Sequence, residues 1–375
     1  MWKWCLAFVI AGAALADDVH PILALGSPAP DFALPGTDGR IHRLADYSQS
    51  PVLAVIFTCN HCPIAQLYED RISQLAADYG DKGVAVVAIQ PNDPNAIRID
   101  ELDSSDLSDS LEEMKVRVRY RHLTYPYLYD GETQSVAEAY GPQATPHAFI
   151  FDSQRRLRYE GRIDNSYRLE LVKTHDARNA IDALLAGKPV PVAHTGVFGC
   201  STKWKSKHAG QLEALRKIEA EPVSVAPASA SDLKALRAND TGKFLLVSFW
   251  KTSCDVCLRQ LPAVEDAFRM YRLREFDAVT VAANPPPQSG EVLGLLKARH
   301  ASTRNLQFAS ADENALEAAF DPAWQSGVPF TVLLAPGGKI LFAQAGEVDM
   351  LRLRRIILSH IMTEYAGFRN YWGTP

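Results

Sequence analysis

The chain contains 375 residues, 47% of them hydrophobic, and its formal net charge at pH 7 is −5. This length suits two domains, each with enough apolar residues to bury a core. Because charges of both signs are spread along the chain, we expect no nucleic-acid partner and no strongly charged substrate.

The first sixteen residues have the composition of a signal peptide. Lys3 supplies a positive charge, residues 5–15 are apolar, and Ala14-Leu15-Ala16 resembles a cleavage site. A buried N-terminal helix is the alternative interpretation. No later segment approaches the roughly 20 apolar residues of a transmembrane helix. The sequence therefore predicts an exported bacterial protein, periplasmic or secreted, with no transmembrane segment after signal cleavage.

Residues 17–195 alternate buried strands with amphipathic helices. Apolar, β-branched residues at 52–57 predict a strand buried on both faces. A Cys-x-x-Cys pair follows, and then Pro63, which suits the first turn of a helix. The further elements expected are a strand at 84–89, a helix near 107–120, an extended segment at 125–129, a short helix at 133–140, strands at 147–151 and 157–163, and a helix at 176–186.

The same plan recurs in residues 231–375. The elements expected there are a strand at 244–250, a second Cys-x-x-Cys pair, a helix to about 272, a strand at 278–283, a helix at 289–299, strands at 330–334 and 339–344, and a closing helix at 348–362. Residues 196–230 are expected to form a linker with a short helix near 208–219, because the run from Pro222 is poor in large apolar residues. Two copies of one plan predict two like domains.

Two other segments stand out by composition. Residues 100–110 carry several acidic side chains among serines, which predicts a solvated loop, with a metal site as the alternative. The aromatic residues of the C-terminal tail are expected to pack against the second domain rather than to bind a ligand. They are Tyr365, Phe368, Tyr371 and Trp372.

The cysteines indicate redox chemistry. Four of the six form two closely spaced pairs, Cys59/Cys62 and Cys254/Cys257. Stabilising disulfides usually join residues that are distant in sequence, whereas a close pair in a large domain favours a reactive dithiol. Cys200 has no neighbour in sequence, and we consider three roles for it: a buried small residue, a third redox cysteine reaching Cys59 or Cys62, or an intermolecular link.

Each pair is expected at the start of a helix that follows a buried strand. The helix N-terminus carries about half a positive charge and free N–H groups, which stabilise a thiolate. Such motifs lower the cysteine pKa from about 8.5 to roughly 3.5–7. We expect Cys59 and Cys254 to be the attacking sulfurs, and Cys62 and Cys257 to be the resolving ones.

Supporting residues accompany both pairs. Pro146 follows Thr145, and Pro329 follows Val328, at matching places in the two repeats. If the fold places these prolines beside the sulfurs, each is expected to shape a substrate groove. His61 lies between the first two cysteines and is expected to favour the thiolate. The alternative for His61 is a solvent-facing histidine. The alternative for the two cysteine pairs is a structural zinc site formed by all four cysteines. We expect no metal and no cofactor other than the redox-active disulfides.

Residues 26–187 resemble the peroxiredoxin-like (AhpC/TSA, redoxin) branch of the thioredoxin superfamily. The matching pieces are APDFALPGTDGR, FTCNHCPIAQLYEDR, YGDKGVAVVAIQPND, YGPQATPHAFIFD and YEGRIDN, and the tail from GKPVP to GCSTKWK is also similar. Residues 231–363 resemble thioredoxin/TlpA-like domains through SFWKTSCDVCLRQLP and GVPFTVLLAPGGKI. The resemblance implies an α/β fold of two tandem thioredoxin-like domains, each a central mixed sheet flanked by helices.

The family name also suggests a peroxidase, but the residues depart from that pattern. Peroxiredoxins place Thr or Ser three residues before the reactive cysteine and Pro four residues earlier, whereas Ile56 and Val52 occupy those positions before Cys59. The partner arginine expected near the strand at 147–151 is replaced by Thr145-Pro146. The resemblance therefore implies a redoxin fold with thioredoxin-type chemistry.

These features predict an exported thiol–disulfide oxidoreductase, with protein thiols or disulfides, or a membrane or soluble thiol reductant, as partners. Asp255 should raise the pKa of Cys254 by like-charge repulsion, which would make the second pair the more reducing one and allow electrons to pass to Cys59/Cys62. Two alternatives stay open. One is a thiol peroxidase with a built-in reductant domain, and the other is a Cu(I) carrier that uses thiolates with His61, Cys200 or His208.

Overall fold

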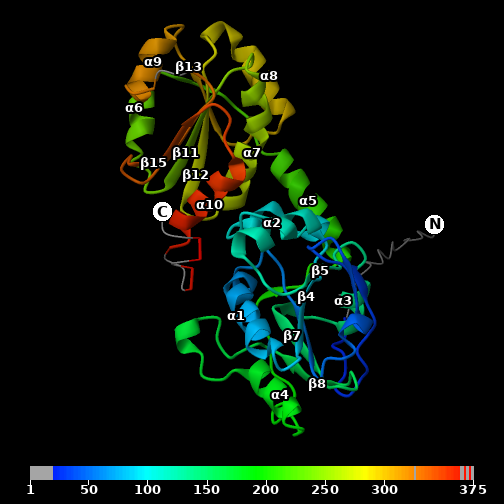
Figure 1. The fold of residues 1–375 in the computed structure, drawn as a ribbon. Helices are drawn as coiled ribbons and strands as arrows, with labels where there is room; N and C mark the ends of the chain where they lie inside the picture. The colour runs from blue at the N-terminus through cyan, green and yellow to red at the C-terminus, as the bar shows by residue number, and fades with distance from the viewer. Residues whose placement is uncertain (1–19, 325–326, 364–366, 369–370, 373–375) are drawn as a thin grey trace, which may run out of the picture.

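The protein folds into two α/β domains that lie end to end (Figure 1). The computed structural model describes residues 20–324, 327–363, 367–368 and 371–372. The signal peptide expected at residues 1–16 lies outside the described residues. No helix within the described ranges has the length and apolar run needed to cross a membrane.

The first domain is built on a five-stranded mixed sheet with the order β5-β4-β3-β7-β8. Strand β3 is buried along its whole length, as its continuous apolar sequence predicts, and it pairs in parallel with β4 and antiparallel with β7. The strands are β3 (Leu53–Phe57), β4 (Ala85–Gln90), β5 (Tyr127–Tyr129), β7 (His147–Phe151) and β8 (Leu157–Gly161).

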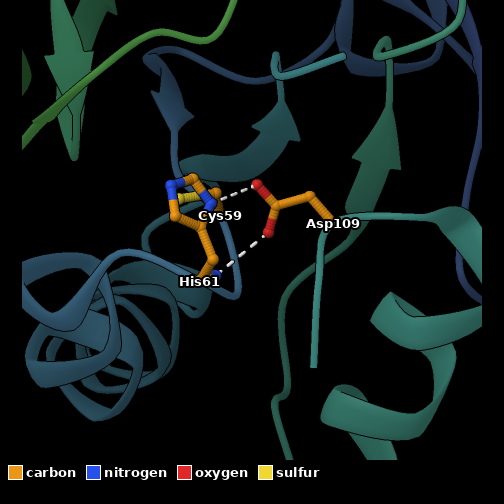
Figure 2. A group of neighbouring side chains, drawn as sticks. All are labelled: Cys59, His61 and Asp109. Atoms are coloured by element: carbon orange, nitrogen blue, oxygen red, sulfur yellow. Dashed lines mark hydrogen bonds and ion pairs between the residues drawn. The ribbon is translucent and has the colours of Figure 1, made fainter. Parts of the chain in front are cut away.

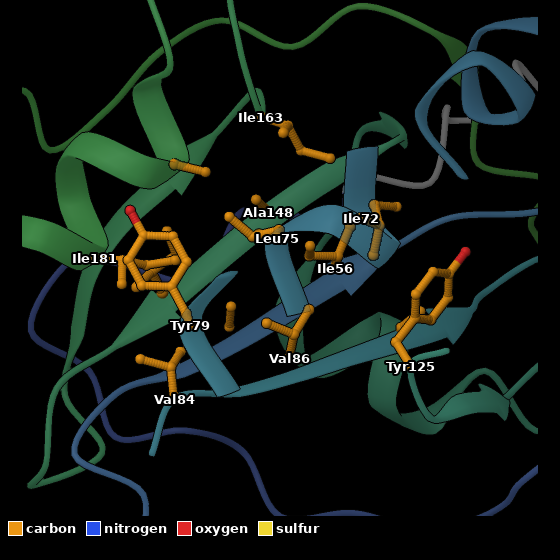
Figure 3. Packing of buried hydrophobic residues seen from close by; sticks show 14 of the residues in the cluster. Ile56, Ile72, Leu75, Tyr79, Val84, Val86, Tyr125, Ala148, Ile163 and Ile181 are labelled. Atoms are coloured by element: carbon orange, nitrogen blue, oxygen red, sulfur yellow. The ribbon is translucent and has the colours of Figure 1, made fainter. Parts of the chain in front are cut away.

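Two apolar layers cover this sheet. On one face, α1 and α4 pack side chains such as Ile72, Leu75 and Ile181 against strand residues that include Ile56 and Val86 (Figure 3). The other face is covered by α3 and by the hairpin of β1 and β2. The elements are β1 (Ala33–Pro35), β2 (Ile41–Arg43), α1 (Pro63–Gly80), α2 (Leu111–Arg121), α3 (Ser135–Tyr140) and α4 (Asp176–Leu185).

The second domain repeats this plan around a six-stranded sheet with the order β10-β13-β12-β11-β14-β15. Its strands are β10 (Ala226–Ala228), β11 (Phe244–Trp250), β12 (Phe276–Ala282), β13 (Arg304–Phe308), β14 (Phe330–Leu334) and β15 (Ile340–Ala345). Its helices are α6 (Ala230–Ala238), α7 (Asp255–Tyr271), α8 (Ser289–Ala298), α9 (Glu313–Phe320) and α10 (Met350–Ile361). The predicted fold class, two tandem thioredoxin-like domains each with a central mixed sheet flanked by helices, is confirmed.

The segment expected to be a linker, residues 196–230, is built into both domains at its ends. Strand β9 (Cys200–Ser201) pairs with β6 (Ala144–Thr145) of the first domain. At the other end, β10 pairs with β13 of the second domain. Between them lies α5 (His208–Glu219), where the short helix was expected.

The two domains share an interface that combines apolar packing with polar contacts. The hydroxyl of Tyr271, at the end of α7, donates to the carbonyl oxygen of Ser105 at 2.9 Å. The fully buried carboxylate of Asp106 accepts from Arg117 of the first domain at 2.8 Å and from Arg355 of the second at 2.7 Å. Breaking a buried charge pair of this kind costs about 3–5 kcal/mol, so Asp106 ties the domains together.

The described residues of the aromatic tail also reach the first domain. Tyr371 donates to Glu69 at 2.7 Å and accepts from Arg117 at 2.8 Å. Phe368, Tyr371 and Trp372 belong to the apolar cluster of the second domain, against which Leu67 of the first domain packs. The described residues of the tail therefore pack against the second domain, as expected, and they also contact the first domain. Tyr365 lies outside the described residues.

Candidate active site

The first cysteine pair lies in the connection between β3 and α1. Strand β3 ends at Phe57, and α1 begins at Pro63 with Cys62 as its N-cap residue. Pro63 explains this start, because its fixed φ suits the first helical position and its missing N–H would have no partner there. Cys59 and Cys62 are 1% and 0% exposed, so neither sulfur is open to solvent.

Thr145 contacts both sulfurs, as expected for a residue beside the active pair. Its Oγ1 shares a hydrogen bond with Cys59 Sγ at 3.1 Å, and its carbonyl oxygen accepts from Cys62 Sγ at 3.4 Å. The Thr145–Pro146 peptide bond is cis. Residues more than 80 positions apart in sequence are thus brought together around the two thiols.

The two thiols differ in their pKa. Burial raises the pKa of Cys59 well above its usual value, and the neighbouring Cys62 raises it further. Burial also acts to raise the pKa of Cys62, but hydrogen bonds from Cys200 and Cys59 and the charge of His61 hold it well below its usual value. When the reduced pair ionises, these directions favour the charge on Cys62, whose hydrogen bond to the Thr145 carbonyl is then lost, whereas the sequence led us to expect the charge on Cys59.

His61 is buried and paired with Asp109 (Figure 2). Its Nδ1 lies 2.6 Å from a carboxylate oxygen of Asp109, whose other oxygen accepts from the backbone N–H groups of Asn60 and His61. Burial lowers the pKa of His61, but the charge and hydrogen bond of Asp109 raise it above its usual value. The interpretation of His61 as a solvent-facing histidine is therefore wrong.

The acidic segment at residues 100–110 differs from the solvated loop that its composition predicts. Ser104, Ser105, Asp106 and Asp109 are fully buried. Charge pairing explains this burial, because Asp106 meets Arg117 and Arg355 while Asp109 meets His61. Sequence reasoning missed Asp109 as a site residue, and nothing in the local pattern distinguishes it from its acidic neighbours.

Cys59, His61 and Asp109 form the one group of potential metal ligands found among the described residues, with ligand atoms within 4.8 Å of one another. The carboxylate of Asp109 already accepts from two backbone N–H groups, from Asn92 and from His61. A metal ion would have to displace His61 from it, so the arrangement favours a hydrogen-bonded His61–Asp109 pair over a metal site. His208 is exposed at the start of α5, outside this group.

Cys200 lies against the first pair. Its backbone N–H donates to Cys62 Sγ at 3.2 Å, and its side chain hydrogen-bonds the same sulfur. The hydrogen bond to Cys62 raises the pKa of Cys200, and burial raises it further. Cys200 is partly exposed, in contrast to Cys59 and Cys62. The structure therefore brings together three of the predicted cysteines, with His61, Thr145 and Pro146.

The second pair has a different local geometry. Cys254 is the N-cap residue of α7, Cys257 lies in the first turn, and the two form a disulfide with a Cα–Cα distance of 5.2 Å. The sulfur of Cys254 accepts from the N–H of Cys257 at 3.1 Å. Val328 packs against the cluster that contains both cysteines, and its peptide bond to Pro329 is cis.

The two cysteine pairs are far apart along the molecule. Helix α7 has 17 residues and is therefore about 25 Å long. Its C-terminal residue, Tyr271, contacts the first domain, whereas Cys254 stands at its other end. In this arrangement the disulfide of the second domain does not face the thiols of the first.

Comparisons with known proteins agree with these features. Residues 25–160 match the AhpC/TSA family. The chain is 29% identical over 136 residues to the thiol-disulfide oxidoreductase ResA of Geobacillus thermodenitrificans, a match that covers 36% of this chain and 68% of that protein. The corresponding protein of Geobacillus kaustophilus is 28% identical over the same shares.

Two solved structures show the extent of the structural match. A hypothetical protein from Sinorhizobium meliloti is 37% identical, with a TM-score of 0.44, and the match covers 50% of this chain and 97% of that one. A putative thiol:disulfide interchange protein DsbE from Chlorobium tepidum is 20% identical, with a TM-score of 0.33 over 44% of this chain and 97% of that one.

Proposed function

Residues 25–160 belong to the AhpC/TSA family, and from this premise we propose that the chain is an exported thiol–disulfide oxidoreductase that uses two Cys-x-x-Cys pairs. The enzyme class agrees with the named relatives, which are thiol-disulfide oxidoreductases. The observation that carries the proposal is the dithiol Cys59/Cys62 at the start of α1, in contact with Thr145. The disulfides themselves are the redox groups, with no dissociable cofactor.

The chemistry at the first pair is a two-electron exchange. A thiolate attacks one sulfur of a partner disulfide and forms a mixed disulfide, and one partner thiolate leaves. The second cysteine then attacks the mixed disulfide, so that a Cys59–Cys62 disulfide forms and the partner departs as a dithiol. Because the pKa of Cys62 is lowered and that of Cys59 is raised, we assign the first attack to Cys62.

His61 and Asp109 position this centre. Asp109 holds the imidazole through Nδ1 and holds the loop through the N–H groups of Asn60 and His61. Its charge favours the protonated imidazole, which in turn favours a thiolate nearby. Stabilising the thiolate stabilises the reduced form, so the first pair should be the more oxidising of the two.

The partners we propose are protein thiols or disulfides, or a membrane or soluble thiol reductant. Exchange between the two pairs is a further part of the proposal, with electrons passing from Cys254/Cys257 to Cys59/Cys62. Since Cys254 lies about one 25 Å helix from the domain contact, exchange within one chain requires the domains to separate. Exchange between the first domain of one chain and the second domain of another does not require the domains to separate.

Trapping tests the proposal. Cys59→Ser and Cys62→Ser are compared in full-length protein that also carries Cys200→Ser, so that no third thiol of the domain can release a bound partner. We expect the Cys59→Ser variant to retain a mixed disulfide with insulin chains or periplasmic proteins through Cys62. A mixed disulfide formed only by the Cys62→Ser variant would return the attacking role to Cys59, and its absence from both variants would contradict dithiol exchange.

Two assays on the same variants separate the alternatives. Peroxide consumption that depends on Cys59 or Cys62 and exceeds insulin reduction would favour a thiol peroxidase. One equivalent of Cu(I) retained by the reduced wild type, together with no insulin reduction, would favour a metal carrier. The proposed function predicts insulin reduction without either result.

A further inference from the structure

Strand β9 is an addition to the first domain that lies outside its central sheet. It forms a two-stranded antiparallel pair with β6, in which Cys200 stands opposite Thr145 and Ser201 opposite Ala144. Thr145 is also the residue that contacts both Cys59 and Cys62. Because β9 pairs with Thr145, its residues lie close to the two sulfurs.

Gly199 makes this close approach to Thr145 feasible. Its φ is +144°, and a Cβ atom at this position would collide with the carbonyl oxygen of Thr145. Glycine is the residue that accepts such a backbone conformation and leaves room for another chain. The strand is thus fitted to Thr145 at the position immediately before Cys200.

The residues after Cys200 fasten the strand to the domain. The N–H of Lys203 donates to Asn92 Oδ1 at 2.8 Å, and the hydroxyl of Thr202 donates to the carbonyl of Pro142 at 2.7 Å. Trp204 is buried and stacks on His20 with ring centroids 3.6 Å apart. The segment is therefore anchored on the C-terminal side of Cys200, and the anchors keep its sulfur at the site.

We propose that β9 is a built-in substrate strand, whose Cys200 exchanges disulfides with Cys62 and carries them between the buried pair and outside thiols. Strand addition is a common way for a protein to bind an extended peptide, and here the chain supplies that peptide itself. The proposal rests on the proposed dithiol exchange at Cys59/Cys62. It adds the route by which two solvent-excluded sulfurs reach a partner, because Cys200 is the partly exposed member of the three.

The first step conserves electrons within the chain. In the oxidised domain the Cys200 thiolate attacks Cys62 Sγ, a Cys62–Cys200 bond forms, and the Cys59–Cys62 bond breaks. Cys59 leaves as a thiolate and takes up the proton that Cys200 gave up. Once released, Cys59 is held as a thiol because burial raises its pKa, and Thr145 Oγ1 stands 3.1 Å from its sulfur.

The second step uses an external dithiol, such as a reduced partner protein. One of its thiolates attacks Cys200 Sγ, and Cys62 departs as a thiolate, which its lowered pKa makes a good leaving group. The second partner thiol then releases Cys200, so that the partner leaves as a disulfide and the chain gains two electrons. The reverse sequence oxidises a partner.

Disulfide mapping in the full-length chain tests the proposal. Wild type, Cys59→Ser and Cys200→Ser are oxidised in a glutathione buffer, blocked, digested without reductant and analysed by mass spectrometry. We expect a Cys62–Cys200 disulfide in Cys59→Ser and a Cys59–Cys62 disulfide in Cys200→Ser. The Cys254–Cys257 disulfide in each sample provides an internal check that oxidation occurred.

A second variant tests the strand rather than the thiol. Gly199→Ala in the Cys59→Ser background retains Cys62 and Cys200 but displaces β9 from Thr145, and it should slow Cys62–Cys200 formation about 10²-fold. Circular dichroism of this variant checks that the domain is folded. Equal rates with and without Gly199→Ala would show that pairing with Thr145 does not guide the exchange, and would overturn the role of β9.

The outcomes separate this inference from the proposed function. If wild type forms Cys59–Cys62 while Cys62 and Cys200 stay free in Cys59→Ser, the inference fails and dithiol exchange stands. If Cys200→Ser and wild type both keep Cys59 and Cys62 reduced at every buffer ratio while Cys254–Cys257 forms, then the proposed function of the first pair fails as well.

Discussion

The two Cys-x-x-Cys pairs share a motif but not a helix register. In the first domain the helix begins after the second cysteine, so that Cys62 caps α1, whereas in the second domain it begins after the first, so that Cys254 caps α7. The free N–H groups of a helix stabilise charge at its cap. The helix start therefore contributes to the choice of thiolate, and in the first domain it adds to the hydrogen bonds from Cys200 and Cys59 and to the charge of His61.

The residue that follows each N-cap cysteine explains why the two helices start at different positions of the motif. Pro63 follows Cys62 and suits the first helical position, whereas Asp255 follows Cys254 and suits the first turn through its charge. The residues beside the two pairs also differ in burial. His61 and Asp109 are buried beside the first pair, whereas Asp255 is exposed beside the second. The first pair is a buried polar centre, whereas the second pair has one partly exposed sulfur, that of Cys254, and one buried sulfur, that of Cys257.

The largest effect should come from the acidic residue at each pair. Asp109→Asn removes the charge that faces the buried His61 and should destabilise the first domain by about 3–5 kcal/mol. Asp255→Asn, the matched control at the exposed position, should change stability by less than about 0.5 kcal/mol. Urea denaturation followed by hydrogen exchange of residues 53–121 and 244–282 measures both. Similar shifts for the two variants would show that the acidic residue is no more important to stability at the buried first pair than at the partly exposed second pair.

Thiol accessibility should distinguish the pairs next. In the reduced protein, Cys254 is partly exposed, whereas Cys59 is 1% exposed and reacts only after local opening. We expect iodoacetamide to modify Cys59 about 10²-fold more slowly than Cys254, which corresponds to an opening free energy of about 3 kcal/mol. Peptide mass spectrometry over a time course gives both rates. Equal rates would mean that the first pair is open in solution.

A substitution at the interface between the domains should change stability by a smaller amount. Tyr371→Phe removes the hydroxyl that contacts Glu69 and Arg117, and leaves those buried charges with one partner fewer. The expected loss is about 1–3 kcal/mol. Tyr167→Phe, at a tyrosine that is 39% exposed, is the control and should be near neutral. Thermal unfolding measures both, and the account of the tail fails if the two variants shift the midpoint equally.

The smallest effect should be the change in the stability of the first domain with pH, which depends on the His61–Asp109 pair. The pKa of Asp109 is lowered from 3.8, mainly by His61 against the effect of burial, so its contribution to stability is present above pH 3.8 and is lost as pH falls through the folded value. The pKa of His61 is raised from 6.5, so its contribution is complete below pH 6.5 and is lost as pH rises through the folded value.

The first domain should therefore be most stable between about pH 4 and 6.5 and should lose stability above that range. Among the described residues of the second domain no such pair lies beside the cysteines, so this domain should show a flatter profile there. Urea midpoints of each domain between pH 5 and 9 check this difference. His61→Gln should flatten the profile of the first domain, and an unchanged slope in that variant would assign the pH dependence to another group.

The fold could be predicted from the sequence because its signals are local. The buried strands before each cysteine pair, the helix start at Pro63 and the recurrence of the plan are all visible within short windows. Strands β10 and β13 and helices α6 and α9 were not predicted, since β10 and α9 are short and are held by tertiary contacts.

The site was predictable only in part, because its remaining contacts join distant residues. Thr145 and the cysteines follow from the motif and the resemblance, whereas the His61–Asp109 contact spans 48 positions. The contact between Cys200 and Cys62 spans 138 positions, and that between Tyr371 and Glu69 spans 302. No local pattern distinguishes Asp109 from the other acidic residues of its segment, and its burial depends on the folded arrangement of β4, α2 and the cysteine loop.

The most direct test of the account is a redox titration of the full-length chain in which each disulfide is quantified separately by peptide mass spectrometry. Cys59–Cys62 and Cys254–Cys257 should both form and break reversibly within roughly −120 to −270 mV, the range of known dithiol oxidoreductases, with the second pair at the lower potential. A first pair that stays reduced throughout, or a second pair that is the more oxidising, would contradict this expectation.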